Sequence, residues 1–375
     1  MSVLEEFHNI VSSPHQFARD WKEQTGGKVL GYLCTNLPEE MLYAAGVLPV
    51  RLLGTLEIEN VTGSYIWATT FCSFSRDCFA QALQGRYDYI DGITYAFCCL
   101  HARHVFESWK RHIPVQYSYE LYVPYQLLNR HAKTFLTKEL EEYKRSLQEW
   151  TGRSISDTDL DKAIDIYNTN RRLMRQIYEL MKADDPPVTE AEVAEIALSG
   201  MLIDKVSHNR LLEQALAELP KRKGRGNHGP RLMLLGSVNY DIEFLKSIDS
   251  LGGHVVIDDY CTGSRYYQTE VVPEKNRLAS LASREIGKPP CPLKDLPERR
   301  RPVHQAKLAS DYRVKGAIYT IQRMCDSHGL DYPAIESSLK EKGIPMLKLE
   351  LNFGVPAGQF RTRLEAFLEM LEASS

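Results

Sequence analysis

The amino-acid sequence predicts an α/β protein with two parallel-sheet domains and a helical segment between them. The N-terminal and C-terminal parts each alternate short apolar runs with amphipathic stretches, which is the pattern of strand–helix–strand units. The middle part carries apolar residues at spacings of three and four, with few β-branched runs, which is typical of helices. Because 375 residues exceed the usual size of one domain, more than one core is expected.

The first domain is expected over residues 1–134. Its first unit runs from the strand KVLGYL through a helix to the strand VLPVRLLG. Asn36 and Glu39 have the spacing of a capping box at the start of that helix, and Gly46 ends it. A second unit repeats the pattern, and its helix carries Ala102, Val105 and further apolar residues on one face. The expected strands lie at 28–33, 47–54, 87–97 and 113–121.

A helical segment is expected over residues 135–228, with about three helices. It ends in KRKGRGNHGPR at 221–231, which is basic and glycine-rich without periodicity, so it reads as a solvated linker rather than a phosphate site.

The second α/β domain is expected over residues 229–375. It repeats the strand–helix–strand unit and closes with a helix at about 357–372. In its last unit, a strand ends at Cys325 and the helix signal opens at Asp331-Tyr332-Pro333. Both domains are thus expected to be Rossmann-like or flavodoxin-like.

Composition narrows the class of protein. The chain is 43% hydrophobic and 25% charged with a formal net charge of −3, so it has no basic surplus for nucleic acid. The segment MSVLEEFHNI lacks the basic and apolar regions of a secretion signal, and no apolar run reaches the length of a membrane span. We expect a cytoplasmic protein without nucleic-acid or membrane partners.

The cysteines suggest where chemistry is done. They are dispersed along a long chain, which favours free thiols over disulfides, with metal or cluster ligation as one possibility and buried small side chains as the other. Several directly follow predicted strands, at the sheet edge where ligands gather, whereas Cys72 follows a weaker run, IWATTF, and precedes a helix. No paired CxxC or ferredoxin spacing is present. The eight are Cys34, Cys72, Cys78, Cys98, Cys99, Cys261, Cys291 and Cys325.

Three segments carry a family resemblance. GYLCTNLPEEMLYAAGVLPVRLLG, TTFCSFSRDCFAQALQGRYDYIDGI and MCDSHGLDYPAI resemble the matching segments of the 2-hydroxyacyl-CoA dehydratase and benzoyl-CoA reductase family, in particular the smaller of its two cluster-bearing subunits. The likeness covers nearly the whole chain, including the order of α/β unit, helical insertion and α/β unit.

The resemblance implies a [4Fe–4S] cluster held by three cysteines. Carried onto this sequence, the ligands are Cys72, Cys99 and Cys325, with Cys99 preferred to Cys98 because of its ten-residue distance to Trp109. The fourth iron position is left open or filled by another ligand. Cys34 and Cys78 are weaker candidates, and Cys261 and Cys291 weaker still.

The resemblance also implies partners: a related larger cluster-bearing subunit, ATP-hydrolysing activator subunits fed by reduced ferredoxin, and an acyl-CoA substrate. This chain has no GxxxxGK[ST] loop, so ATP is expected to be used by partner subunits only.

Other polar residues have two interpretations each. Glu39 and Glu40 either donate protons at the cluster or serve as helix N-terminal charges, and His101 and His104 either contact a thioester or lie on a solvated face. His328 is a candidate neighbour of the cluster. PERRRPVH at 297–304 either meets coenzyme A phosphates or forms a solvated loop or a contact with another subunit. Asp258-Asp259 resembles a ribose-binding position, but GSVNYD lacks GxGxxG, which argues against NAD.

Three functions follow. The first is the iron–sulfur subunit of an ATP-dependent benzoyl-CoA reductase, which passes low-potential electrons to an aromatic acyl-CoA and yields a cyclic dienoyl-CoA. The second is the β subunit of a 2-hydroxyacyl-CoA dehydratase, with no net reduction. The third is a non-catalytic scaffold whose cysteines are inert.

Overall fold

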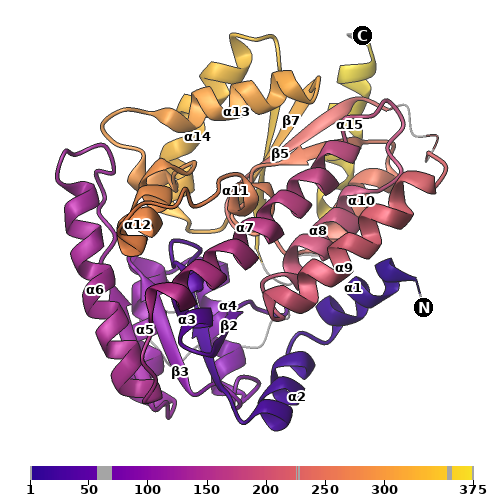
Figure 1. Cartoon of the computed structure of the whole chain (residues 1–375). Helices are drawn as coiled ribbons and strands as arrows, with labels where there is room; N and C mark the ends of the chain where they lie inside the picture. Colours follow the sequence, from indigo (N-terminus) through magenta and orange to yellow (C-terminus); the bar gives the residue numbers. More distant parts are fainter. Residues whose placement is uncertain (1, 57–69, 225, 227–228, 353–356, 374–375) are drawn as a thin grey trace.

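Two parallel sheets of four strands each form the framework of the protein (Figure 1). The computed structural model describes residues 2–56, 70–224, 226, 229–352 and 357–373. In spatial order the first sheet consists of β2 (Val47–Arg51), β1 (Lys28–Tyr32), β3 (Gly92–Ala96) and β4 (Tyr117–Leu121). The second consists of β6 (His254–Asp258), β5 (Arg231–Gly236), β7 (Gly316–Gln322) and β8 (Met346–Leu351).

All neighbouring strands pair in parallel, so the carboxyl ends of each sheet lie along one edge. In both sheets the strand order reverses between the first and third strands, β1 and β3 or β5 and β7. This is the doubly wound, flavodoxin-like order, whose switch point is the usual place for a ligand. The predicted fold class, α/β with two parallel sheets, is confirmed.

Helices connect the strands and cover the sheets. Those of the first half are α1 (Val3–Ser12), α2 (Gln16–Thr25), α3 (Glu39–Ala44), α4 (Ser73–Leu83) and α5 (Leu100–His112). The middle of the chain forms α6 (Ala132–Thr151), α7 (Asp157–Leu180), α8 (Glu190–Ser199) and α9 (Lys205–Glu218). The second half has α10 (Ile242–Ser250), α11 (Ser264–Tyr267), α12 (Arg277–Gly287), α13 (Arg300–Asp311), α14 (Asp326–Lys340) and α15 (Arg361–Ala373). Short 3₁₀ turns occupy Leu219–Lys221, Pro292–Lys294 and Ala357–Phe360.

Apolar periodicity accounts for how these helices pack. On α5 the predicted core face, including Val105 and Trp109, is buried. The middle segment forms four helices where about three were expected, and it packs against both halves: α7 on α3 and α11, α6 on α12, and α8 on α1 and α10. Figure 1 shows α7 running from the half that holds β2 and β3 toward the half that holds β5 and β7. The domain boundaries at 134/135 and 228/229 stay a prediction.

Two local expectations were wrong. The capping box of Asn36 and Glu39 is not formed, because α3 begins after Pro38 without a side-chain cap and the Glu39 carboxylate instead interacts with buried partners. Helix α14 begins at Asp326, five residues before the predicted signal, and Pro333 lies inside it. An interior proline removes one backbone hydrogen bond and crowds the carbonyl four residues earlier, and α14 continues through Pro333 despite this cost.

Two stretches lie partly outside the described residues. The run IWATTF is described only from Thr70, and the basic stretch 221–231 has gaps, although Arg222 pairs with Glu192 at 3.0 Å and Arg231 begins β5. Within the described residues, we find no helix with the length and apolar character needed to cross a membrane.

Candidate functional site

Three cysteines occupy the same structural position, the residue immediately before a helix. Cys72 is the N-cap of α4, Cys99 of α5 and Cys325 of α14. Cys99 and Cys325 follow the carboxyl ends of β3 and β7, the third strand of each half. These are the residues carried over from the family resemblance, and the sequence places them at equivalent positions in two sheets.

The Cys99 sulfur is bonded to a backbone N–H at its helix start, and the backbone N–H three residues on lowers the thiol pKa at Cys72 and Cys325. The Cys99 Sγ accepts a hydrogen bond from the backbone N–H of Ala102 at 3.5 Å. Burial raises the pKa of the Cys72 thiol, whereas the hydroxyl and backbone N–H of Ser75 lower it. Burial and the neighbouring Cys72 raise the pKa of Cys325, and the backbone N–H of His328 opposes them. At all three positions the N–H belongs to the residue three places after the cysteine.

His101 connects the three helix starts. Its Nδ1 accepts a hydrogen bond from the backbone N–H of Cys72 at 3.2 Å, and its Nε2 lies 3.9 Å from the carboxylate of Asp326, the first residue of α14. Burial lowers the pKa of His101. The ring therefore lies between the N-termini of α4 and α14 while belonging to α5. His104, one turn further on, stacks on Phe71 at 4.7 Å.

The same region joins the two halves of the chain. The Ser73 hydroxyl donates to the Gln322 amide oxygen at 2.8 Å, and the Ser73 N–H donates to the Arg323 carbonyl at 3.3 Å. Gln322 is the last residue of β7 and is itself held by Ser237 and Val238 after β5. The start of α4 is thus fixed to the switch point of the second sheet.

The three thiols are not a preformed single-ion site. Across the described ranges, no group of three or more His, Cys, Asp or Glu side chains is placed to hold a metal ion. All eight cysteines are free thiols.

The remaining cysteines form a second set. Cys34, Cys261 and Cys291 line a small cavity of about 60 Å³ together with Lys288 and His328. The adjacent Cys98 and burial raise the pKa of Cys34 well above its usual value. Cys98 therefore faces Cys34, whereas Cys99 caps α5. Cys78 is fully buried, with its sulfur 3.7 Å from the Leu52 carbonyl, as expected of a packing residue.

Glu39 and Glu40 lie in a buried charge network. Tyr266 donates to Glu39 at 2.5 Å, and the Lys205 ammonium lies 3.7 Å from the same carboxylate. Arg171 donates to Glu40 at 2.6 Å, and this pairing lowers the pKa of Glu40 against the effect of burial. The network joins α3 to α7, α9 and α11, so both carboxylates have structural partners in addition to their helix position.

The arginine run 297–304 is mostly helical, because residues 300–304 belong to α13 and only 297–299 precede it. Arg300 begins α13, and Arg301 is fully buried between Asp331 at 2.8 Å and Asp259 at 3.6 Å. Arg299 also pairs with Asp331. Asp258 accepts hydrogen bonds from Tyr178 and the backbone of Ser264. Both carboxylates of the pair Asp258 and Asp259 therefore have partners within the fold. The expectation of a loop was wrong because long-range acidic partners cannot be read from local charge.

Sequence reasoning missed Arg51, Gln322 and Ser73. Arg51 ends the apolar strand VLPVR, and a cation at the carboxyl end of a buried strand is the signal that could have identified it. Gln322 holds the equivalent position in β7.

Comparison with known proteins identifies the family. Residues 34–371 match the family model described as "2-hydroxyglutaryl-CoA dehydratase, D-component". The chain is 26% identical to the (R)-phenyllactyl-CoA dehydratase beta subunit of Clostridium sporogenes, over 98% of both chains. It is also 26% identical to one of the benzoyl-CoA reductase subunits of Thauera aromatica, over 89% of this chain and 88% of that one. The (R)-2-hydroxyglutaryl-CoA dehydratase beta subunit of Acidaminococcus fermentans matches at 26% over 99% of both.

A solved structure described as "crystal structure of SsGBP and GDP complex" aligns with 92% of this chain and 99% of its own, at a TM-score of 0.25 and 10% identity, which is too low for any conclusion. The sequence relatives are named as subunits of acyl-CoA dehydratases and of an acyl-CoA reductase. With its match over nearly the whole length, the chain belongs to the 2-hydroxyglutaryl-CoA dehydratase D-component family.

Proposed function

We propose that this chain is the smaller cluster-bearing subunit of an ATP-dependent benzoyl-CoA reductase, and that Cys72, Cys99 and Cys325 hold a [4Fe–4S] cluster. The observation that carries the proposal is the convergence of three cysteine-capped helix N-termini from both halves of the chain, joined through His101.

The donor set suits a cluster better than a single ion. In a four-iron cluster each cysteine binds a different iron, so the thiols need not meet around one point, in agreement with the lack of a single-ion site in the described residues. Each sulfur has a backbone N–H nearby, which stabilises a thiolate and an anionic cluster. When bound, the cluster supplies low-potential single electrons to an acyl-CoA.

Aromatic side chains beside Cys99 support an aromatic acyl group. Phe97 stacks on Tyr122 with ring centres 5.7 Å apart and meets Tyr125 edge-on at 5.2 Å. Both tyrosines are exposed. Two relatives carry benzoyl and phenyllactyl in their names. Stacking on such rings favours a phenyl group over an aliphatic one.

Partner subunits are part of the proposal. The exposed apolar side chains Leu100 and Met324 directly flank Cys99 and Cys325, and Leu330 projects from α14 nearby. We expect the related larger subunit to cover them, while activator subunits hydrolyse ATP and take electrons from ferredoxin. The relatives argue against the scaffold alternative, because they are named as enzyme subunits or putative ones. The exposed patch is weaker evidence against it.

The second candidate is a dehydratase β subunit, which the family model and the phenyllactyl-CoA relative favour. The decisive experiment is anaerobic co-purification with the neighbouring subunits, followed by iron and sulfide counting and an assay with benzoyl-CoA, ATP and a strong reductant. A dienoyl-CoA formed with continuous ATP hydrolysis supports the reductase. Dehydration of phenyllactyl-CoA after a single activation contradicts it in favour of the dehydratase, and absence of iron and sulfide after reconstitution rejects both.

A further inference from the structure

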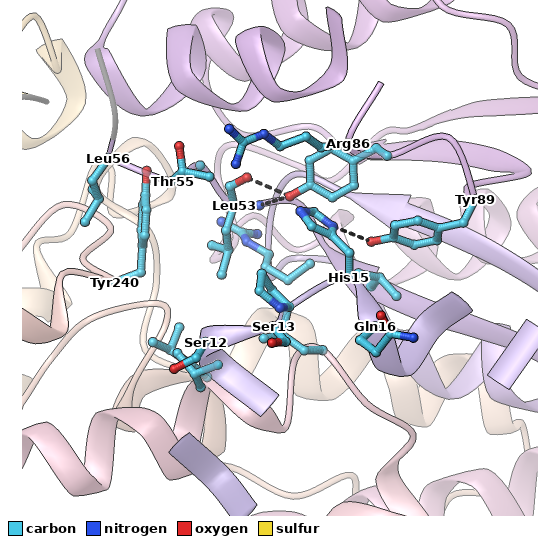
Figure 2. Close-up of a pocket in the computed structure, with 18 residues that line it drawn as sticks. Ser12, Ser13, His15, Gln16, Leu53, Thr55, Leu56, Arg86, Tyr89 and Tyr240 are labelled. Atoms are coloured by element: carbon cyan, nitrogen blue, oxygen red, sulfur yellow. Dashed lines mark hydrogen bonds between the residues drawn. The ribbon is translucent and has the colours of Figure 1, made fainter. Parts of the chain in front are cut away.

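A cavity of about 530 Å³ lies beside the carboxyl end of β2, apart from the small cysteine-lined cavity. Its walls come from the α1–α2 turn, the loop after β2, the α4–β3 connection and Tyr240 after β5 (Figure 2). This volume is within the range of small-molecule sites, roughly 300–1,000 Å³. Two arginines and no carboxylate are found among the described residues that line it.

The Arg51 side chain is almost completely buried, and among the described residues two of its three guanidinium nitrogens have no hydrogen-bond partner. The residue is 3% exposed and lines the cavity, and its Nε and Nη1 atoms are both left without an acceptor there. The rings of Tyr32 and Phe74 lie with their centres 5.7 Å from the guanidinium carbon and offer only cation–π contact. A buried cation without an anion costs several kcal/mol, on the order of the cost of breaking a buried ion pair. The site is therefore complete only when an anion binds.

An uncharged aromatic wall completes the cavity. His15 Nδ1 and the Tyr89 hydroxyl are hydrogen-bonded at 3.1 Å, and the His15 and Tyr87 rings meet edge-to-face at 4.7 Å (Figure 2). The Tyr87 hydroxyl is fixed to the backbone of Leu53 by bonds of 2.9 and 2.6 Å. Burial together with Arg19 and Arg86 lowers the pKa of His15 to about 4, so its ring is neutral near pH 7. These rings are held in place before any ligand binds.

We propose that this cavity binds a nucleotide, with a phosphate on the Arg51 guanidinium and the base against the rings of His15, Tyr87 and Tyr89. The planar guanidinium matches phosphate oxygens in two parallel hydrogen bonds, and aromatic rings accept any base by stacking. A free phosphate or an aromatic acid would leave most of about 530 Å³ unfilled. The existence of this nucleotide site does not depend on the proposed function. Only the assignment of the bound nucleotide to coenzyme A rests on that function.

The test is calorimetric titration of the full, anaerobically purified chain with AMP, coenzyme A, inorganic phosphate and benzoate. Saturable one-to-one binding of AMP or coenzyme A supports the site. Tighter binding of AMP indicates a site for a free nucleotide, and tighter binding of coenzyme A indicates a site for the nucleotide end of the substrate. Arg51→Met should weaken that binding by about tenfold to a hundredfold, as expected for loss of charge-assisted hydrogen bonds. Arg210→Met, which removes an exposed arginine on α9, should leave it unchanged.

Three results would overturn the proposal: no binding of either nucleotide, equal affinity in Arg51→Met, or tighter binding of phosphate or benzoate than of nucleotide. A thermal melt of Arg51→Met serves as the control for misfolding. Because the substitution removes an unpaired buried charge, the melting temperature should be equal to that of the parent chain or higher. Iron and sulfide content, measured on the same samples, should not change. Failure of the nucleotide site is thus distinguishable from failure of the cluster proposal.

Discussion

Cysteine is an unusual residue to begin a helix. Asn, Asp, Ser and Thr satisfy the free N–H groups of a helix start better than a thiol does, and Ser156 and Thr189 do so in α7 and α8 with full capping boxes. At Cys72 and Cys325 the side chain makes no capping hydrogen bond. Cys72 and Cys325 give up the capping hydrogen bond, and the Cys99 bond is long at 3.5 Å, so a role for sulfur outside the helix is the simplest physical reason.

The choice between Cys98 and Cys99 can be tested directly. Cys99→Ala, like Cys72→Ala and Cys325→Ala, should lose the cluster's electron paramagnetic signal and most of the bound iron after anaerobic reconstitution, because one sulfur ligand is removed. Cys98→Ala and Cys78→Ala should retain both, since these thiols face the core. Far-ultraviolet circular dichroism serves as the folding control. A full signal in Cys325→Ala would show that the ligand set is wrong.

The pair of Arg171 and Glu40 makes a prediction about stability. The two side chains are 2% and 1% exposed and only 2.6 Å apart. Arg171→Met should reduce the free energy of unfolding by about 3–5 kcal/mol, because it leaves the Glu40 carboxylate buried without its cation. Urea denaturation measures the change.

A double substitution separates the lost charge pair from lost packing. Glu40→Leu combined with Arg171→Met should recover most of the stability, since an apolar pair of similar volume carries no desolvation cost. A double variant as unstable as Arg171→Met alone would assign the effect to packing or to the Asn168 contact of the arginine.

Among the elements, the ends of strands were easier to predict than the starts of strands or helices. The strand expected at 87–97 begins only at Gly92, and the one expected at 113–121 begins at Tyr117. The buried strands β1, β3 and β7 are short apolar runs that need no knowledge of distant residues. The start of α14 depends on Gln322, Cys325 and the contact with α4. The local signal at Pro333 therefore placed that start five residues too late. Helix α13 was missed for a similar reason, because Arg301 within it is neutralised by Asp259 and Asp331 from other parts of the chain.

The junction of α8 and β6 predicts a pH dependence. Glu190, the first residue of α8, and Asp258, the last of β6, are buried next to each other. Burial raises the pKa of Asp258 to about 6, and burial together with Asp258 raises the pKa of Glu190 well above its usual value. Both folded-state values lie above the unfolded ones, so the folded state binds more protons and stability falls as pH rises above about 4.

Glu190→Gln should remove most of this loss. The variant is expected to be more stable than the parent chain at pH 8 and nearly equal to it at pH 4, because the amide stays uncharged at both pH values. Thermal melts at the two pH values measure the difference. Equal stability gains at both pH values would mean that the amide improves packing, and a loss of stability at pH 8 would contradict the raised pKa of Glu190 as the cause.

For the whole molecule, the central relation is that the third strand of each sheet leads to a cysteine at the start of the next helix, and that the start of α4 is bonded to the end of β7. β3 leads to Cys99, β7 leads to Cys325, and the hydrogen bonds of Ser73 to Gln322 and Arg323 tie the helix that follows Cys72 to the end of β7. Sequence patterns could place each cysteine at a strand end or helix start. They could not show that the start of α4 is bonded to the end of β7, because that depends on tertiary contacts between residues some 250 positions apart. The family resemblance, rather than spacing, supplied the grouping.

The partner surface gives the last prediction. Leu330 on α14 is 76% exposed, close in sequence to Cys325, and a large exposed apolar residue at such a place marks an interface. Leu330→Asp should weaken co-purification with the larger subunit by about tenfold or more, because a charge at the centre of an apolar contact must be desolvated without a partner. The isolated variant should keep its iron and its melting temperature, since so exposed a side chain contributes little to packing within its own chain. Val272→Asp, at a residue 73% exposed that is not close in sequence to any of the three cysteines, is the matched control and should co-purify normally. If both variants associate as well as the parent chain, the subunits meet elsewhere and the exposed residues around Cys99 and Cys325 need another explanation.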